Sequence, residues 1–314
     1  MKTNRTFMVV IILLGAITFL SCSNDIETAN TEDVGVSFMA GISQKVVDSN
    51  SGTRAYDNVW EANDAIGVFM FEHGASEKLE ENRKYITTGG DGAFSPASGN
   101  DIYYPMNGSQ VDFMAYYPYT TTLGAITLEG TTLTVNVENQ AVQKDLDLLW
   151  AENKTGHSKS QGSTGVELQF SHRLAKLIIN VKVGDGVEGV LEGMTMTIKN
   201  MYTQNTFNLL DGTLNDQPSN INDIIPYKVD NDKVASGYIA SFEAIVIPND
   251  YAALDGVKME FLAGSNTYTW EMGAVTIESL NKYTYDIVLN RTGVEVNGGS
   301  ITGWIDNPKG GSAT

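Results

Sequence analysis

The only cysteine of the chain, Cys22, is the residue whose position points most directly to a chemical role. It follows an apolar run from Phe7 to Leu20, which is itself preceded by two basic residues. A basic start, a short apolar segment and a small residue before the break are typical of a secretory signal. A cysteine directly behind such a segment is similar to a bacterial lipobox, in which the thiol takes a diacylglycerol and becomes the first residue of the mature chain. The sequence therefore predicts a signal peptide over residues 1–21 and a lipid on Cys22. The alternative is an ordinary signal peptide with a chance cysteine.

Histidine is the side chain most often used for acid–base catalysis, and the chain has 3 histidines. His73, His157 and His172 are far apart in the sequence and lack the spacing of metal ligands. His172 shares the strand parity of Leu168 and Phe170, which favours a buried, hydrogen-bonded structural histidine over a catalytic base. The sequence contains neither a Gly-x-Ser-x-Gly turn nor a P-loop. We therefore expect no catalytic residue, no cofactor and no enzymatic activity.

One acidic stretch, Asp230-Asn231-Asp232, has the start of a calcium-binding loop. Val234 stands where an EF-hand needs its third oxygen ligand, and Ser241 stands where it needs the bidentate glutamate. A solvated turn is the better interpretation. The 38 acidic residues also offer many carboxylate pairs of the kind used in glycoside hydrolysis, but no pair is distinguished by its surroundings. We predict no metal site.

The charge balance excludes two classes of partner. Without Lys2 and Arg5, which lie in the predicted signal peptide, 18 basic residues remain against 38 acidic ones, and the net charge is about −20. This balance repels nucleic acid and anionic lipid headgroups, so contact with the membrane is expected to run through the lipid on Cys22. A lipidated Cys22 leaves no thiol for a disulfide, and stability must therefore come from hydrophobic cores.

The first patterned segment follows a polar, acidic tether over residues 22–33. Apolar side chains alternate with small or polar ones, which predicts a strand with one buried face formed by Val34, Val36, Phe38, Ala40 and Ile42. A polar loop over residues 48–58 comes next and has no side chain suited to packing. The strand thus lies between two segments that are expected to be flexible.

The same period-two alternation recurs over residues 133–137, 194–198, 257–261 and 283–289, with glycine- and aspartate-rich turns between the runs. Only the segment from Glu77 to Tyr85 suggests a helix. The predicted fold class is therefore mainly β, with antiparallel β-sandwiches.

A stretch without large apolar side chains over residues 152–165 predicts a long loop or a linker. It divides the chain into an N-terminal sandwich over residues 34–165 and a C-terminal sandwich over residues 166–314. Beyond it, the buried parity changes after His172, which predicts a bulge or a bend between residues 173 and 176.

Several stretches, in their order along the chain, resemble the fimbrillin-like lipoproteins of Bacteroides and its relatives, which are subunits of type V surface pili. The stretches that carry the resemblance are Thr53-Arg54-Ala55, Trp60, Asn63-Asp64-Ala65-Ile66-Gly67-Val68-Phe69, Ile102-Tyr103-Tyr104-Pro105, Val111-Asp112-Phe113-Met114-Ala115-Tyr116-Tyr117-Pro118, Phe170-Ser171-His172-Arg173-Leu174-Ala175-Lys176-Leu177, Tyr283-Thr284-Tyr285 and Ile301-Thr302-Gly303-Trp304. The resemblance implies two transthyretin-like sandwich domains. It also implies a route of assembly in which a trypsin-like protease cuts after an arginine between the first two strands. The first strand then leaves, and a strand from a neighbouring subunit fills its groove.

In this chain Arg54 is the only arginine between Arg5 and Arg83, and it lies in the polar loop after the first strand. Cleavage is therefore expected between Arg54 and Ala55, where a protease can bind an extended chain. The alternative is that Arg54 is simply a loop residue and the chain is never cut.

The donor strand is expected from the C-terminal end, where the candidate side chains are Val294, Val296, Ile301 and Trp304, although Gly298-Gly299 interrupts them. The predicted function is that of a fimbrial subunit and adhesion protein, located at the outer membrane and, after processing, in a fimbrium. Its expected partners are copies of itself or related subunits, the processing protease, and ligands on host or bacterial surfaces. The alternative is a monomeric surface lipoprotein that binds glycans through its tyrosines and tryptophans.

Overall fold

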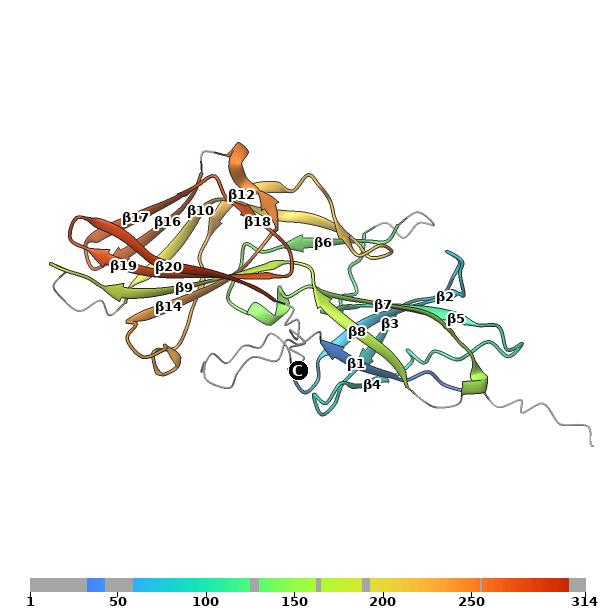
Figure 1. The fold of residues 1–314 in the computed structure, drawn as a ribbon. Coiled ribbons are helices and arrows are strands. Elements are labelled where there is room, and N and C mark those ends of the chain that lie inside the picture. Colours follow the sequence, from blue (N-terminus) through green and yellow to red (C-terminus); the bar gives the residue numbers. More distant parts are fainter. Residues whose placement is uncertain are drawn as a thin grey trace, which may run out of the picture. The chain divides into compact units, whose positions relative to one another are not determined.

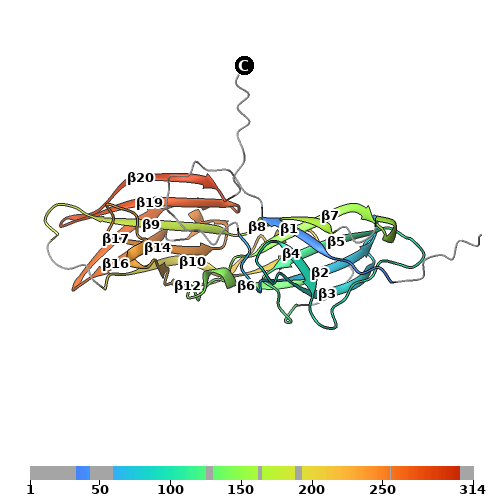
Figure 2. The same ribbon diagram turned by 90° about the horizontal axis from the view of Figure 1, so that it is seen from below.

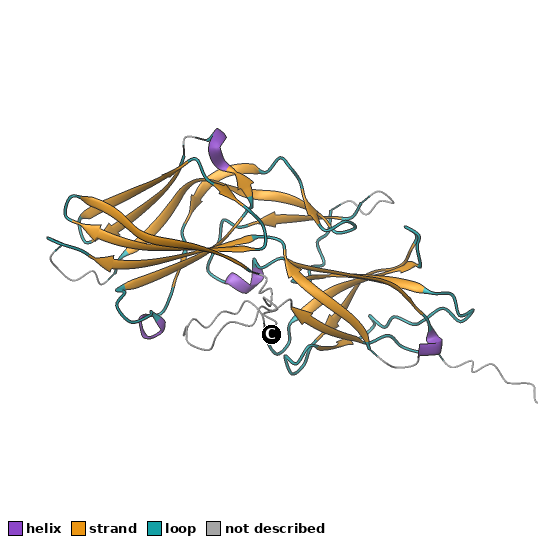
Figure 3. Ribbon diagram, viewed as in Figure 1, coloured by secondary structure: helices purple, strands orange, loops and turns teal. Residues whose placement is uncertain are grey.

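The computed structural model describes residues 33–42, 59–124, 130–161, 165–187, 193–254 and 256–304, which consist almost entirely of strands and loops (Figures 1 and 3). Helical turns within these ranges are short and of the 3-10 type: η2 (Gln143–Asp145), η3 (Lys159–Gln161), η4 (Asn231–Lys233) and η5 (Tyr251–Ala253). Within the same ranges, no helix has the length and apolar character needed to cross a bilayer. The predicted signal peptide and Cys22 lie outside the described residues, as do Arg54 and Ala55.

Seven strands form a closed barrel in the order β1-β4-β3-β2-β5-β7-β8. Their bounds are β1 (Phe38–Ile42), β2 (Ala65–Glu72), β3 (Lys78–Ile86), β4 (Ala93–Pro96), β5 (Val111–Tyr117), β7 (Leu149–His157) and β8 (Val166–His172). Strand β5 is buried along its whole length. Its Phe113 and Ala115 face the barrel core, whereas Met114 and Tyr116 on the other face belong to the core of the following sheets. Strand β5 is therefore apolar on both faces, because each face is covered.

Two further sheets enclose the second core and are visible as layers in Figure 2. One contains β6 (Thr132–Asn136), β10 (Thr195–Asn208), β11 (Thr213–Leu214), β12 (Ser219–Ile224), β16 (Val257–Ala263) and β17 (Asn266–Gly273). The other has the order β13 (Tyr227–Lys228), β14 (Ala240–Val246), β9 (Ala175–Val183), β19 (Asn281–Asn290) and β20 (Gly293–Gly303). A small sheet pairs β15 (Asn249–Asp250) with β18 (Thr276–Ile277). Alternate residues of β9 and β14 pack against those of β10 and β16, which makes this half a sandwich.

The prediction of a mainly β fold is confirmed, but two strand pairs are not antiparallel. Strand β1 runs parallel to β8, and β9 runs parallel to β19. Parallel pairing needs a long connection between the strands. Here the connections contain most of the barrel in the first case and most of the sandwich in the second. The alternation of apolar and polar side chains along one strand indicates which face is buried, but it does not indicate whether the neighbouring strand runs parallel or antiparallel.

The helix suggested for Glu77 to Tyr85 is wrong, because these residues lie largely in β3. The strand pairs with β2, with register shifts opposite Val68 and Met70, and Asn82 adopts a positive φ of 45°. Charged residues three apart, such as Arg83 and Glu80, form ion pairs across this irregular stretch as they would on a helix. Pairing with β2 has overridden the local pattern.

The loop expected over residues 152–165 is also partly wrong, since β7 continues to His157 and pairs with β5 as far as Val111. The barrel includes β8, so the chain passes from the barrel to the sandwich between His172 and Ala175, where the change of parity was noted. Strand β6, which precedes β7, pairs with β10 of the sandwich. The described residues all belong to one compact unit, and the division into domains at residue 165 stays a prediction.

Candidate strand-exchange site

The first strand has the alternating burial expected from its sequence. Val36, Phe38, Ala40 and Ile42 are buried, while Met39 and Gly41 on the other face are exposed. Val34, just before β1, is partly buried and packs against the same core. The strand therefore contributes its whole apolar face to the barrel interior, and that face would leave an apolar groove if β1 departed.

Aromatic rings surround the centre of β1. The ring of Phe38 packs edge-to-face on Tyr85 and Phe113, with centroids 4.9 Å and 5.2 Å away. The buried hydroxyl of Tyr85 donates to the carbonyl of Val36 at 3.1 Å, and burial raises the pKa of this phenol. The indole of Trp60 donates to the carbonyl of Ala40 at 2.7 Å. These side chains would line the emptied groove and offer two donors to an incoming backbone.

The backbone of β1 is bonded on both edges. Its ladder with β8 runs over five positions, from Phe38 opposite Val166 to Ile42 opposite Phe170. On the other edge β1 pairs with β4, and the amide of Ala40 donates to Gly92 at 2.8 Å. Gly92 has a φ of +83°, and a Cβ there would lie 2.5 Å from the carbonyl oxygen of Ala40. Only glycine permits this approach, so the groove is shaped to hold a strand on two edges at once.

The C-terminal strand β20 has the opposite character. It pairs with β19 at one edge of the sheet, and most of its side chains are exposed, including 67% of Ile301 and 38% of Val296. The ladder shifts register between Tyr285 and Ile287, opposite Asn297 and Gly298, and Gly299 pairs with Tyr285. Because of this shift, all three apolar side chains of the strand lie opposite residues of the buried face of β19: Val294 opposite Leu289, Val296 opposite Ile287, and Ile301 opposite Tyr283. The shift therefore keeps the apolar residues on one face, whereas the sequence suggested an interruption.

Trp304, the fourth donor candidate, differs from the other three. It follows β20 directly, is 1% exposed, and stacks on the ring of His172 with centroids 4.1 Å apart and planes at 9°. His172 is itself fully buried, and its Nδ1 lies 2.7 Å from a carboxylate oxygen of Asp147. This matches the structural histidine expected there. The contact with Trp304 was not anticipated, although both residues lie in stretches that carried the family resemblance.

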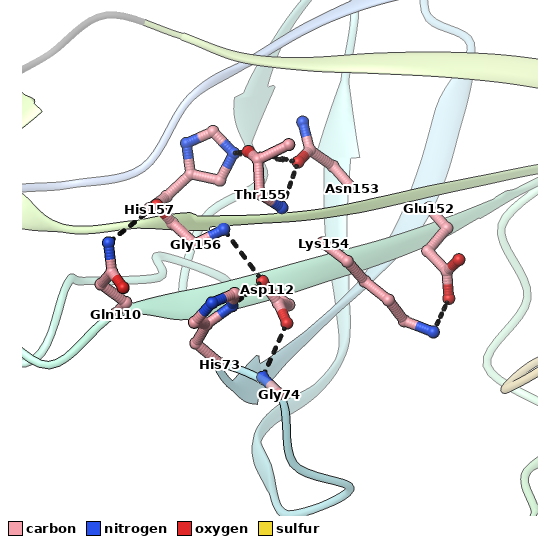
Figure 4. A network of polar contacts seen from close by, with 10 residues as sticks. All are labelled: His73, Gly74, Gln110, Asp112, Glu152, Asn153, Lys154, Thr155, Gly156 and His157. Atoms are coloured by element: carbon pink, nitrogen blue, oxygen red, sulfur yellow. Dashed lines mark hydrogen bonds and ion pairs between the residues drawn. The ribbon is translucent and has the colours of Figure 1, made fainter.

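A second polar cluster joins the barrel strands at one end (Figure 4). Asp112 in β5 accepts hydrogen bonds from the amides of Gly74 at 3.0 Å and Gly156 at 3.1 Å, and its other contact is Nδ1 of His73 at 2.8 Å. Burial alone would raise the pKa of the Asp112 carboxyl, but these three contacts outweigh it and hold the pKa below its ordinary value. Asp112 is not among the site residues predicted from the sequence; its signals are a charge inside an apolar strand and its place in a stretch that carries the family resemblance.

The remaining histidine and the acidic loop also have structural surroundings. His157 lies within hydrogen-bond distance of Asn153 and Thr155, at 3.1 Å and 3.0 Å. Asp230 pairs with Lys233 across the turn η4. In the part of the chain that the structure describes, no three His, Cys, Asp or Glu side chains gather where a metal could bind.

Burial also bears on the tyrosines that the glycan-binding alternative would need. Tyr104, Tyr116 and Tyr117 are buried in the two cores, and Tyr103 is 48% exposed. The buried rings serve packing and cannot present a flat face to a sugar.

Comparison with known proteins gives a consistent result. The sequence model of the fimbrillin-like family matches residues 53–304. A Bacteroides uniformis protein named as a fimbrium subunit, Fim1C, is 34% identical over 271 residues, which cover 82% of this chain and 83% of that protein. The crystal structure of a protein described as a cell adhesion protein, also from B. uniformis, has a TM-score of 0.66 at 30% identity and covers 87% of this chain and 98% of that one. A second such structure, from Bacteroides ovatus, has a TM-score of 0.66 at 21% identity and supports the fold alone.

Proposed function

The chain belongs to the fimbrillin-like family and is a fimbrial subunit of the cell surface, and we propose that it assembles by exchange of its first strand for a strand of a neighbouring subunit. The observation that carries this proposal is the state of β1. The strand buries one apolar face in the barrel and is bonded on both edges. The segment from Val34 to Ile42 that contains it lies between a tether and a loop that the sequence predicts to be flexible.

Release of β1 needs a break in the chain after Ile42. We place this break between Arg54 and Ala55, within the polar loop, because Arg54 is the only arginine that a trypsin-like protease could use between Arg5 and Arg83. Removal of β1 exposes its ladder partners on β4 and β8 together with the rings around Phe38. A groove with two unpaired strand edges and an apolar floor binds an extended peptide.

The strand β20 is suited to donation. It is long, bonded on one edge, and carries Val294, Val296 and Ile301 on one face. Exchange would move Val296 and Ile301 from exposed positions, and Val294 from a half-buried one, into the apolar groove of another subunit, and burial of apolar surface favours that state. The donor and the groove thus complement each other in hydrogen bonding and in hydrophobicity.

The lipid on Cys22 completes the proposal. It would hold the precursor at the outer membrane until cleavage separates residues 22–54 from the rest. The fimbrium would then grow from copies of this chain or related subunits, and ligands on host or bacterial cells would be bound by the assembled surface.

The test is the mature N-terminus and its consequence for assembly. Protein purified from the cell surface should begin at Ala55 and form ladders of oligomers on gels without boiling. An Arg54→Gln precursor should remain intact, lipidated and monomeric, whereas the matched Arg291→Gln variant, at an exposed hairpin turn, should be processed like the parent. A surface protein that retains lipidated Cys22 and still assembles would overturn the proposal.

A further inference from the structure

Trp304 is the only buried aromatic residue at the C-terminal end of the described chain, and it marks an abrupt change along the strand. Residues of β20 before it are mostly exposed, but Trp304 is 1% exposed, and its amide donates to the carbonyl of Leu280. Its indole Nε1 finds no acceptor among the described residues. The ring is therefore held by packing: it belongs to the buried core of the sandwich, and one of its contacts is a ring that lies flat against it.

That ring belongs to His172, the last residue of the barrel strand β8. The two planes are nearly parallel, and Asp147 holds the edge of the His172 ring through a hydrogen bond with Nδ1. The end of the sandwich strand β20 is thus attached to the barrel and depends on the position of β8.

Strand β8 in turn depends on β1. Its ladder with β7 contains two positions, Leu149 opposite His172 and Trp150 opposite Ser171. Its ladder with β1 contains five positions and ends at Phe170, two residues before His172. Beyond the two paired positions, the contact between β7 and β8 includes a side-chain bond from Asn153 to the carbonyl of Glu167. Figure 1 shows β1 and β8 side by side. Loss of β1 therefore removes the longer of the two ladders that hold β8.

We propose that β8 couples the first strand to the last: while β1 is in place, the His172–Trp304 stack fastens β20 to its own subunit, and departure of β1 loosens the stack and frees β20. This coupling rests on the proposed function, because it takes β20 to be the donor strand. Trp304 then holds the donor in its own subunit and is not one of the side chains that enter the groove of the neighbour. His172 and Trp304 act as positioning residues. A precursor that still holds β1 would keep its donor strand docked and would not assemble prematurely.

Energetic coupling between two sites is reciprocal, which gives a test that does not need assembly. Hydrogen exchange is measured by mass spectrometry on the intact, full-length protein, over residues 38–42 and 294–303. Phe38→Ala weakens the docking of β1 and should speed exchange in β20 by about tenfold through increased local opening. Trp304→Ala should in turn speed exchange in β1, because the coupling acts in both directions. Ile42→Ala is the milder second variant, should Phe38→Ala fail to fold.

Two controls separate coupling from general loss of stability. Met70→Ala removes a buried side chain from β2, which is not a ladder neighbour of β1, and should leave exchange in β20 unchanged. His172→Phe keeps a flat ring for Trp304 and should protect β20 better than His172→Ala does. Equal acceleration by Met70→Ala and Phe38→Ala, or no response of β20 to Phe38→Ala, would refute the coupling.

The same variants distinguish failure of this inference from failure of the proposed function. If cleaved subunits assemble but exchange in β20 does not respond to Phe38→Ala, strand exchange is supported and the coupling through His172 and Trp304 is refuted. If the two strands respond to each other but the protein never assembles after cleavage, the coupling is supported and strand exchange is refuted.

Discussion

The first and last described strands differ in almost every property that determines how firmly a strand is held. Strand β1 has five residues, a buried face and partners on both edges, whereas β20 has eleven residues, mostly exposed, and pairs with β19. Both carry apolar side chains on one face. The difference teaches that an apolar strand pattern does not fix burial: the same pattern forms the core at one end of the chain and lies largely in solvent at the other. An exposed apolar edge strand is normally a liability, and its presence here favours a second destination for β20.

The contrast between β1 and β20 would fail if both strands contributed equally to the free energy of unfolding of the isolated subunit. Phe38→Ala should lower the free energy of unfolding by about 3–5 kcal/mol, because it leaves a cavity among Tyr85, Phe113 and their neighbours. Ile301→Ala should change it by no more than about 0.5 kcal/mol, since the side chain is exposed. Urea denaturation of full-length protein measures both. Similar losses for the two variants would contradict the assignment of β1 and β20 to unlike roles.

Glycines at positive φ sharpen the comparison at the level of the backbone. Gly92→Ala should cost about 2–3 kcal/mol, because φ is +83° and the new Cβ would lie 2.5 Å from the Ala40 carbonyl oxygen. Gly298→Ala meets no atom within 4 Å, although its φ is +136°, and an edge strand can relax, so about 1 kcal/mol is expected. Thermal unfolding of the two variants gives the order. A larger loss at Gly298 would show that the bulge in β20 is fixed more tightly than the groove beside β1.

Acid sensitivity should originate in the barrel that holds β1. The pKa of Asp112 is lowered in the folded state, so the folded protein binds this proton less readily than the unfolded chain. Its contribution to stability is present above the ordinary carboxyl pKa of about 3.9 and is lost as the pH falls through the lower folded value. Asp112→Asn should therefore cost about 1–2 kcal/mol at neutral pH, and the difference from the parent should shrink below pH of about 4.

The matched control for this prediction is Asp216→Asn, at an exposed position in the sandwich. Denaturation curves at several pH values are expected to coincide for this variant and the parent. An Asp112→Asn variant whose deficit persists unchanged at low pH would mean that the carboxylate charge is not what ties Gly74, Gly156 and His73 together.

The same contrast explains what could be predicted from the sequence. The alternation from Val34 to Ile42 indicated the buried face of β1 correctly, because a regular strand keeps its parity. The face of β20 could not be predicted, since the register shift at Asn297-Gly298 moves Ile301 onto the side of Val296, and only the partner strand reveals such a shift.

Charge spacing and contacts between distant residues account for the other differences between the sequence-based predictions and the structure. The ion pairs within β3 have a spacing that a helix would share, and only the ladder with β2 identifies the strand. The stack of His172 on Trp304 joins residues more than a hundred positions apart, and the sequence offered no sign of their contact beyond their place in family-like stretches.

A charge on the exposed part of β20 should have the smallest effect on stability of the changes considered and a large effect on assembly. Ile301→Asp and Ser300→Asp each place a carboxylate on the exposed part of β20, so both should leave the free energy of unfolding within about 0.5 kcal/mol of the parent. Ile301 lies on the face that carries Val294 and Val296, and Ser300 lies on the other. If β20 enters the groove vacated by β1, Ile301→Asp would bury an unpaired charge against an apolar floor, whereas Ser300→Asp would keep its charge in water. Oligomer ladders of Arg54-cleaved protein should therefore disappear for Ile301→Asp and persist for Ser300→Asp. Oligomer ladders of equal extent from the two variants would mean that β20 remains paired with β19 in its own subunit and that another segment fills the groove.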